Sequence, residues 1–119
     1  MTLLKNMGKF SRSKGKRGEL ELVHRLQELG FREVHRSQQY RGAAESADVI
    51  GIPGVHIEAK RCERFSIYAA YEQAVHDSEG AEDIPTVFHR RNGKPWLVVM
   101  SLEDWARLYR DYMNCSETE

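Results

Sequence analysis

The run from Asp48 to Lys60 places three charged side chains among residues that are typical of a buried strand. Successive side chains of a strand point to opposite faces, so Glu58 and Lys60 are neighbours on one face and Ile57 points to the other. Asp48 opens an apolar stretch, and Gly51 to Gly54 indicates the turn of a hairpin. We therefore expect Asp48 to lie close to Glu58.

Two carboxylates beside a lysine suit one kind of chemistry. They can hold a hard cation such as Mg²⁺ through oxygen ligands and place a water molecule against a phosphodiester. The pattern thus indicates metal-dependent cleavage of nucleic acid. The alternative for a Glu-x-Lys triplet is a solvated strand face. His56 shares the face of Glu58 and is a further candidate to contact phosphate or to assist a proton transfer.

A helix is predicted from Gly18 to Phe31, with Gly30 as its stop. At about 100° per residue, Glu19 falls on the apolar side with Val23, whereas Glu21 is expected to face solvent. An acid on the core side is unusual, because burying an unpaired charge is costly. The alternative is that Glu19 only occupies the first helical turn, where carboxylates favour the helix dipole.

Several strings in this order carry a family resemblance: Lys14 to Glu19 before a helix, Ala47 to Gly51, Ile57 to Lys60, and Ile84 to Trp96. They resemble the PD-(D/E)xK nuclease superfamily, and within it the archaeal-type Holliday junction resolvases and their phage relatives. The resemblance covers residues 9 to 101. It departs from the family at Ala47, where the superfamily name implies a proline.

The resemblance implies a set of site residues. Glu19, Asp48, Glu58 and Lys60 would be catalytic. Asp48 and Glu58 would bind Mg²⁺, with Mn²⁺ as a substitute, together with the main-chain carbonyl of Ala59. Glu19 would complete the metal site directly or through water. Lys60 would orient the attacking water and counter the charge on the phosphorane.

The resemblance also implies a fold and partners. We expect an α/β (α+β) protein with a restriction-endonuclease-like core, in which helices flank a mixed sheet of about five strands. The expected function is a metal-dependent endodeoxyribonuclease on branched DNA, resolving four-way junctions as a homodimer in recombination or phage DNA processing. The alternatives are a nuclease on flap, single-stranded or duplex DNA, and a non-catalytic DNA-binding protein of the same fold.

The net charge of the chain is zero, which argues mildly against a nucleic-acid binder, but the basic residues are clustered. Candidates for DNA contact lie before the first acid, before Asp48, after Lys60 and at the second hairpin. They are Lys14, Lys16, Arg17, Ser37, Gln39, Arg41, Arg61, Gln73, Arg90, Arg91 and Lys94. The alternatives are a solubilising N-terminal segment, a plain boundary position for Gln73, and a solvated hairpin loop.

We expect a flexible basic arm at residues 1–13 and a single domain at residues 14–115. After the first helix, strands are expected at 32–39, 47–52 and 55–61, then a helix at 66–79. Strands at 86–90 and 96–100, joined through Asn92-Gly93, precede a last helix that Ser101 caps. The apolar side of that helix is made by Leu102, Trp105, Tyr109 and Tyr112.

The compartment is indicated by what the chain lacks. No stretch is apolar for long enough to span a bilayer, and the N-terminus has no continuous apolar region like that of a signal peptide. Cys62 and Cys115 are too few for a disulfide framework or a zinc site. We therefore expect a cytoplasmic protein with reduced thiols and no membrane partner.

Overall fold

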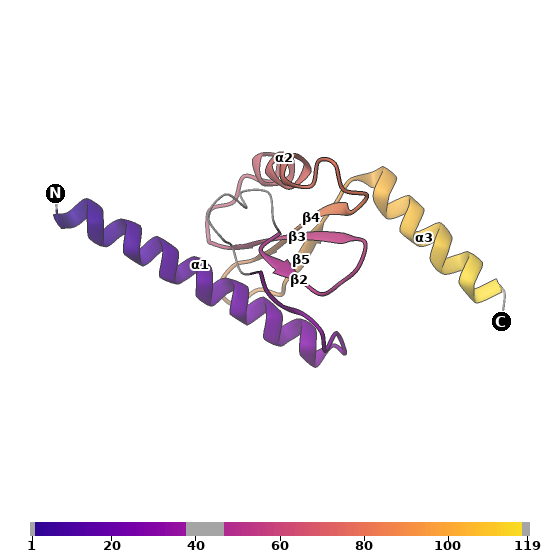
Figure 1. Cartoon of the computed structure of the whole chain (residues 1–119), viewed down its shortest axis with the longest axis horizontal. Coiled ribbons are helices and arrows are strands. Elements are labelled where there is room, and N and C mark those ends of the chain that lie inside the picture. The colour runs from indigo at the N-terminus through magenta and orange to yellow at the C-terminus, as the bar shows by residue number, and fades with distance from the viewer. Residues whose placement is uncertain (1, 38–46, 118–119) are drawn as a thin grey trace.

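The computed structural model describes the backbone of residues 2–37 and 47–117 and the side chains of residues 15–37 and 47–115. The elements follow the predicted order of helix, three strands, helix, two strands and helix. They are α1 (Thr2–Glu28), β1 (His35–Arg36), β2 (Val49–Ile50), β3 (Val55–Arg61), α2 (Ile67–Asp77), β4 (Ile84–Arg90), β5 (Leu97–Val99) and α3 (Leu102–Glu117). Figure 1 shows α1 and α2 on opposite sides of the sheet.

The strands form one mixed sheet in the order β1-β2-β3-β4-β5. Strands β3 and β4 are parallel, with Glu58 opposite Val87, and α2 makes the connection between them. The other pairs are antiparallel, and one of them is the hairpin β4–β5. Gly93 has φ +71°, which suits the predicted Asn92-Gly93 turn. The mixed α+β class and the five-stranded sheet are confirmed.

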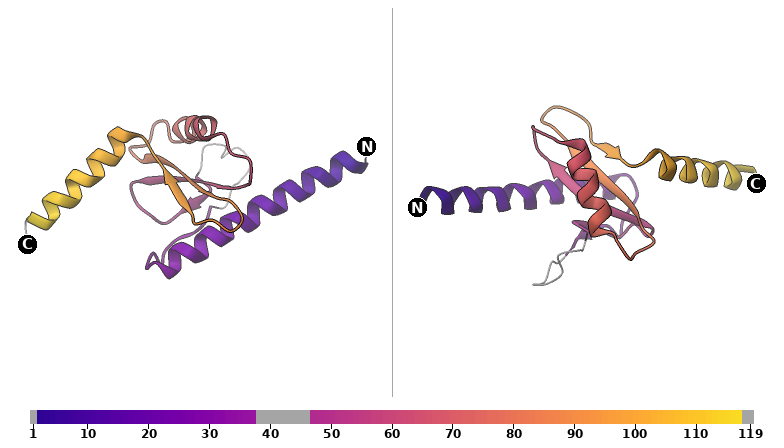
Figure 2. Two further views of the ribbon diagram at one scale, coloured as in Figure 1. Left: turned by 180° about the vertical axis from the view of Figure 1, so that it is seen from behind. Right: turned by 90° about the horizontal axis from the view of Figure 1, so that it is seen from above.

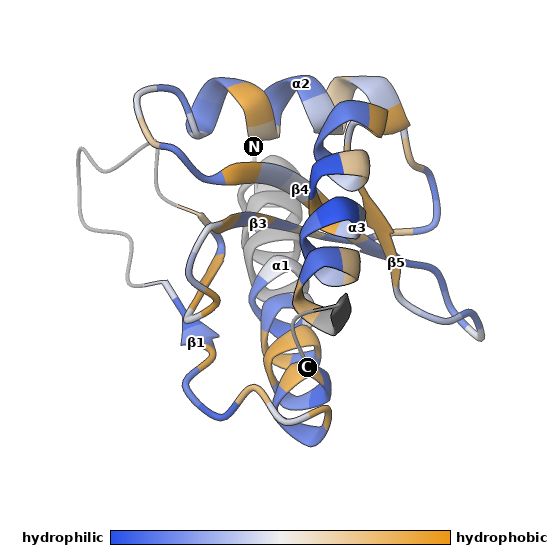
Figure 3. Ribbon diagram, turned by 90° about the vertical axis from the view of Figure 1, so that its right-hand side faces the viewer, coloured by the Kyte–Doolittle hydropathy of each residue, from blue (hydrophilic) through white to orange (hydrophobic). Residues whose placement is uncertain are grey.

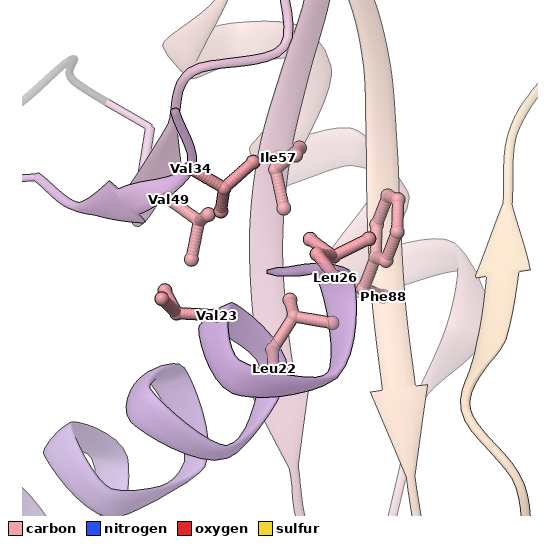
Figure 4. Packing of buried hydrophobic residues seen from close by; sticks show 7 residues of the cluster. All are labelled: Leu22, Val23, Leu26, Val34, Val49, Ile57 and Phe88. Carbon is pink, nitrogen blue, oxygen red and sulfur yellow. The ribbon is translucent and has the colours of Figure 1, made fainter. Parts of the chain in front are cut away.

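Helix α1 covers one face of the sheet through a compact apolar cluster (Figure 4). The cluster consists of Leu22, Val23, Leu26, Val34, Val49, Ile57 and Phe88. Leu22 and Val23 recur with Leu26 at helical spacing, and Ile57 is the strand residue that alternation assigns to this face. Because Leu22 is fully buried, its replacement by alanine should cost about 2–5 kcal/mol.

Helix α2 covers the other face with small side chains. Ala70 and Ala74 pack against Val87 of β4. Since Glu58 is the register partner of Val87, and cross-strand partners share a face, Glu58 lies on the α2 side of the sheet. The predicted alternation along β3 is confirmed, and it places the acid under a helix rather than in open solvent.

Helix α1 is longer than predicted. It begins at Thr2 instead of Gly18, so residues 2–13, expected as a separate arm, belong to the same helix as Glu19. The N-terminal half extends beyond the sheet, as the two views of Figure 2 show. Gly18 lies where the helix crosses β3, and a Cβ atom there would meet the Cβ of Arg61 at 2.5 Å. The glycine read as a helix start is therefore a point of close contact.

Helix α3 projects from the opposite end of the molecule (Figures 1 and 2). Ser101 caps it as predicted, because its Oγ accepts the N–H of Asp104 at 3.1 Å. In Figure 3 the strands and the part of α1 that crosses them carry hydrophobic segments, and α3 carries hydrophobic and hydrophilic residues along its length. Among the helices of the described ranges, none has both the length and the apolarity of a bilayer span.

Candidate active site

Asp48 is fixed beside β3 by its backbone and by its side chain. Its N–H donates to the carbonyl of Ile57 at 2.9 Å, and its Oδ2 accepts the N–H of Ala59 at 2.9 Å. The N–H and C=O of a strand residue point to the same neighbour. The carbonyl of Ala59 therefore points toward Asp48 and away from β4. Strand β2 begins only at Val49, so the Asp48 side chain occupies the place of a further strand residue.

Glu58 lies next along β3 and is 2% exposed. Its Oε1 accepts a hydrogen bond from Nε2 of His56 at 2.8 Å, and both side chains are buried. Asp77, in the last turn of α2, completes a group in which one ligand atom from each residue lies within 4.8 Å of the others. Glu58 is thus shared between Asp48 on one side and the His56–Asp77 pair on the other.

The proximity of Glu58 changes how Asp48 and His56 titrate. Burial, and after it the negative charge of Glu58, raises the pKa of Asp48 to about 6, although the hydrogen bond from the N–H of Ala59 opposes the shift. The hydrogen bond to Glu58 raises the pKa of His56 above its usual 6.5, while burial opposes that shift. A buried pair of carboxylates that disfavours full ionisation is the setting in which a bound cation gains most.

Lys60 follows on the same face of β3. Its Nζ donates to Oε1 of Gln73 on α2 at 3.3 Å. The positive charge of Lys60 also lowers the pKa of Asp48, so the ammonium group acts on the acid pair. Asp48, Glu58 and Lys60 are therefore brought together, and Gln73 is the side chain that positions Lys60.

Glu19 is placed elsewhere. Its Oε2 accepts a hydrogen bond from Nε of Arg36 at 2.7 Å, and both side chains are only partly exposed. Arg36 is the register partner of Val49, whose side chain is buried under α1. The Glu19–Arg36 pair therefore belongs to the α1 face, whereas Glu58 lies on the α2 face. Glu19 is on the inner side of its helix, as predicted, but it contacts an arginine rather than the other acids.

The expectation that Glu21 faces solvent is wrong. Its carboxylate accepts hydrogen bonds from Nε of Arg61 at 3.2 Å and from Nη1 of Arg90. Helical phase alone placed Glu21 away from the core, but α1 crosses β3 so closely at Gly18 that this side reaches the ends of β3 and β4. Glu21 is thus the link between the helix and two strands.

The candidates for DNA contact fall into three groups. Lys16 and Arg17 on α1, Gln73 on α2, and Arg91 and Lys94 in the β4–β5 loop are exposed. Arg61 and Arg90 are paired with Glu21, and the N–H of Ser37 donates to the carbonyl of Asp48 at 3.0 Å. Gln39, Arg41 and the side chain of Lys14 lie outside the described residues. The exposed cations are therefore divided between α1 and the hairpin.

Two polar residues of this region were not singled out from the sequence. Arg36 stands in a weakly alternating segment that gives no signal of its role. Asp77 does carry one, because it lies three residues after Ala74 and seven after Ala70, on the buried side of α2. Glu19 was singled out as an acid on the apolar side of a predicted helix, and the same criterion applies to Asp77.

Comparisons with models of protein families, with curated proteins and with solved structures find no match to this chain. Functional assignment therefore depends on the geometry of the site and on the sequence pattern.

Proposed function

We propose that this chain is a metal-dependent endodeoxyribonuclease with a restriction-endonuclease-like core. The observation that supports this most is the pairing of two carboxyl groups, Asp48 and Glu58, within a mostly buried site that also contains Lys60. A protein that only binds DNA gains nothing from an acid pair that repels phosphate. An enzyme that holds a cation against phosphate requires one.

The donor set fits Mg²⁺ or Mn²⁺. Asp48 and Glu58 supply carboxylate oxygens, and the carbonyl of Ala59 points to the same side of β3 as Asp48. Hard cations prefer such oxygen ligands, and Mg²⁺ usually combines one or two carboxylates with water. When bound, the ion would polarise a phosphoryl oxygen and lower the pKa of a bound water. Glu19 lies with Arg36 on the α1 side of the sheet, so it would have to release Arg36 and turn toward Asp48 before it could contribute, directly or through water.

Each protein group then has a role at the phosphodiester. The Lys60 ammonium group, positioned by Gln73, would orient the attacking water and balance the charge that develops on the phosphorane. His56 would keep the Glu58 carboxylate in place through its 2.8 Å hydrogen bond. No covalent intermediate with the protein is required, since the donor set can direct water itself.

The proposed substrate is branched DNA, with four-way junctions first among the candidates. Support comes from the family resemblance around Asp48 to Lys60 and from exposed cations at two separate places, Lys16 and Arg17 on α1 and Arg91 and Lys94 on the hairpin. A homodimer would present two sites related by a two-fold axis, which symmetric cleavage of a junction requires.

A cleavage assay tests this function. Labelled four-way junction, flap, single strand and duplex of the same sequence are incubated with Mg²⁺, Mn²⁺, Ca²⁺ or EDTA. We expect cleavage of the junction with Mg²⁺ or Mn²⁺, binding without cleavage with Ca²⁺, and no cleavage in EDTA. Glu79→Gln is the matched control, because Glu79 is exposed, pairs with His76 at 3.9 Å and is not among the site residues. Binding of DNA without cleavage in any metal would support the non-catalytic alternative.

A further inference from the structure

Helix α3 carries an exposed apolar stripe. Its large apolar side chains lie within one side of the helix, while Arg107 and Asn114 point to the opposite side at about 100° per residue. The stripe consists of Leu102, Trp105, Leu108, Tyr109, Tyr112 and Met113, which are 39% to 72% exposed. Trp105 stacks on Tyr109 with ring centroids 5.5 Å apart, so the stripe is an ordered surface.

The rest of the described chain leaves this stripe largely uncovered. Helix α3 leaves the sheet after β5 and points away from it (Figures 1 and 2). A helix of 16 residues gains little stability in water by itself, because most helical stability in proteins comes from packing of the apolar side. The stripe would therefore be stabilised by packing against another apolar surface.

A groove on the α1 side of the sheet is a complementary apolar surface. It has a volume of about 370 Å³ and lies between the C-terminal part of α1 and β5. Its lining includes Leu29, Phe31, Ile52, Trp96, Val98 and Met100. Of these, Leu29, Phe31 and Val98 are 47% to 58% exposed. The groove remains open because α1 crosses the sheet over β3 and leaves this side of β5 uncovered.

We propose that the α3 stripe of one chain docks in the α1–β5 groove of a second copy, and that the exchange is reciprocal. Both surfaces lie on one chain, so a two-fold axis can satisfy both at once. Met100 lines the groove and α3 begins at Leu102. The helix therefore leaves from the rim of its own groove, which is the arrangement from which terminal helices are exchanged between protomers.

The exposed area is sufficient for a stable dimer. Taking about 200 Å² for each large side chain, the stripe exposes roughly 600 Å² and the groove residues several hundred more. Docking would thus bury on the order of the 800 Å² per partner that specific interfaces bury. This deepens the homodimer of the proposed function, but it is tested by mass and cross-linking rather than by cleavage, so the two can fail separately.

The first experiment measures the molar mass of the full chain over a dilution series. We expect a dimer, and at least about tenfold weaker association for Tyr109→Glu and for Val98→Glu, because each places a charge in an apolar contact. Asn114→Glu, which adds the same charge to the opposite side of α3, should leave the dimer intact. A monomer at all concentrations, or equal effects of all three variants, would overturn the proposal.

The second experiment identifies which surfaces meet and does not depend on a disruptive variant. In a Cys62→Ser, Cys115→Ser background, Leu108→Cys and Phe31→Cys are made singly and together and then oxidised. We expect a covalent dimer only when both substitutions are present. A covalent monomer would show that α3 folds onto its own groove, and a dimer from Leu108→Cys alone would show pairing of two α3 helices. Either result, or no cross-link, would overturn the proposal.

Discussion

Oδ2 of Asp48 accepts the backbone N–H of Ala59 at 2.9 Å, in the position where a neighbouring strand would otherwise supply a carbonyl. The carboxylate therefore does two things, because it satisfies the edge of β3 and stands beside Glu58. These two uses can be separated by substitution, since an amide oxygen can accept the same hydrogen bond without carrying a charge.

Asp48→Asn should lower the rate of junction cleavage by at least roughly 100-fold, because the amide is a poor ligand for Mg²⁺. The fold should be retained, and DNA affinity should stay the same or increase as repulsion of the phosphates falls. Cleavage rate and affinity are measured on one junction, with the Glu79→Gln variant alongside. Near-normal cleavage by Asp48→Asn would show that Asp48 is not a catalytic residue.

The stability of the metal-free protein should fall as the pH rises. The pKa of Asp48 is raised from 3.8 to about 6. A carboxyl with a raised pKa stabilises the fold below its unfolded value, and this contribution is lost as the pH rises through the folded value. The raised pKa of His56 acts in the same direction above 6.5. The free energy of unfolding, measured by denaturant melts in EDTA, should be higher at pH 3.8 than above pH 6. Asp48 alone accounts for up to about 3 kcal/mol of this difference.

Two controls sharpen this measurement. Asp48→Asn should flatten the pH dependence, because its side chain no longer titrates. Addition of Mg²⁺ should stabilise the wild type at the upper end of the window and stabilise Asp48→Asn much less. Stability that instead rises through the window would show that other groups dominate the titration.

Lys60→Ala should lower the cleavage rate by roughly 100- to 1,000-fold, the scale for loss of one charge partner in the transition state. DNA affinity should change by less than about tenfold, since one phosphate contact contributes little to the total. Gln73→Ala should have a smaller effect in the same direction, because it removes only the group that orients Nζ. Equal losses of rate and affinity would make Lys60 a phosphate contact.

Glu19→Gln and Glu21→Gln should differ in kind. Glu21→Gln weakens the contacts that hold Arg61 and Arg90, so it should cost about 1 kcal/mol of stability. Glu19→Gln should reduce cleavage with little loss of stability, because the proposed role of Glu19 is to join the metal site after its hydrogen bond to Arg36 breaks. Arg36→Ala distinguishes this from a structural role, since it should leave cleavage intact or increase it. Loss of cleavage in Arg36→Ala would mean that the pair itself is required.

The sequence predicted the order of elements well because periodicity is a local property. The strand period of β3 and the helical period of α1 and α2 were sufficient to assign faces to Glu58, Ile57 and Leu22. The prediction for Glu21 was wrong because it depended on how α1 crosses β3. Glu21 pairs with strand arginines because Gly18 lets α1 approach β3, and no helical phase encodes that approach. The N-terminal half of α1 was missed because its clustered basic residues indicated a flexible arm, although Leu3, Met7 and Phe10 recur at helical spacing.

Strand β2 contains only Val49 and Ile50, and the site depends on this short length. Gly51 ends it with φ +114°, and a Cβ atom at this position would meet the carbonyl oxygen of Glu33 at 2.5 Å. If β2 were extended backward past Asp48, a main-chain carbonyl would take the Ala59 N–H, and the acid would be released from the edge of β3. The site is thus made by omitting a strand residue. A register shift of this hairpin would erase it without changing one side chain.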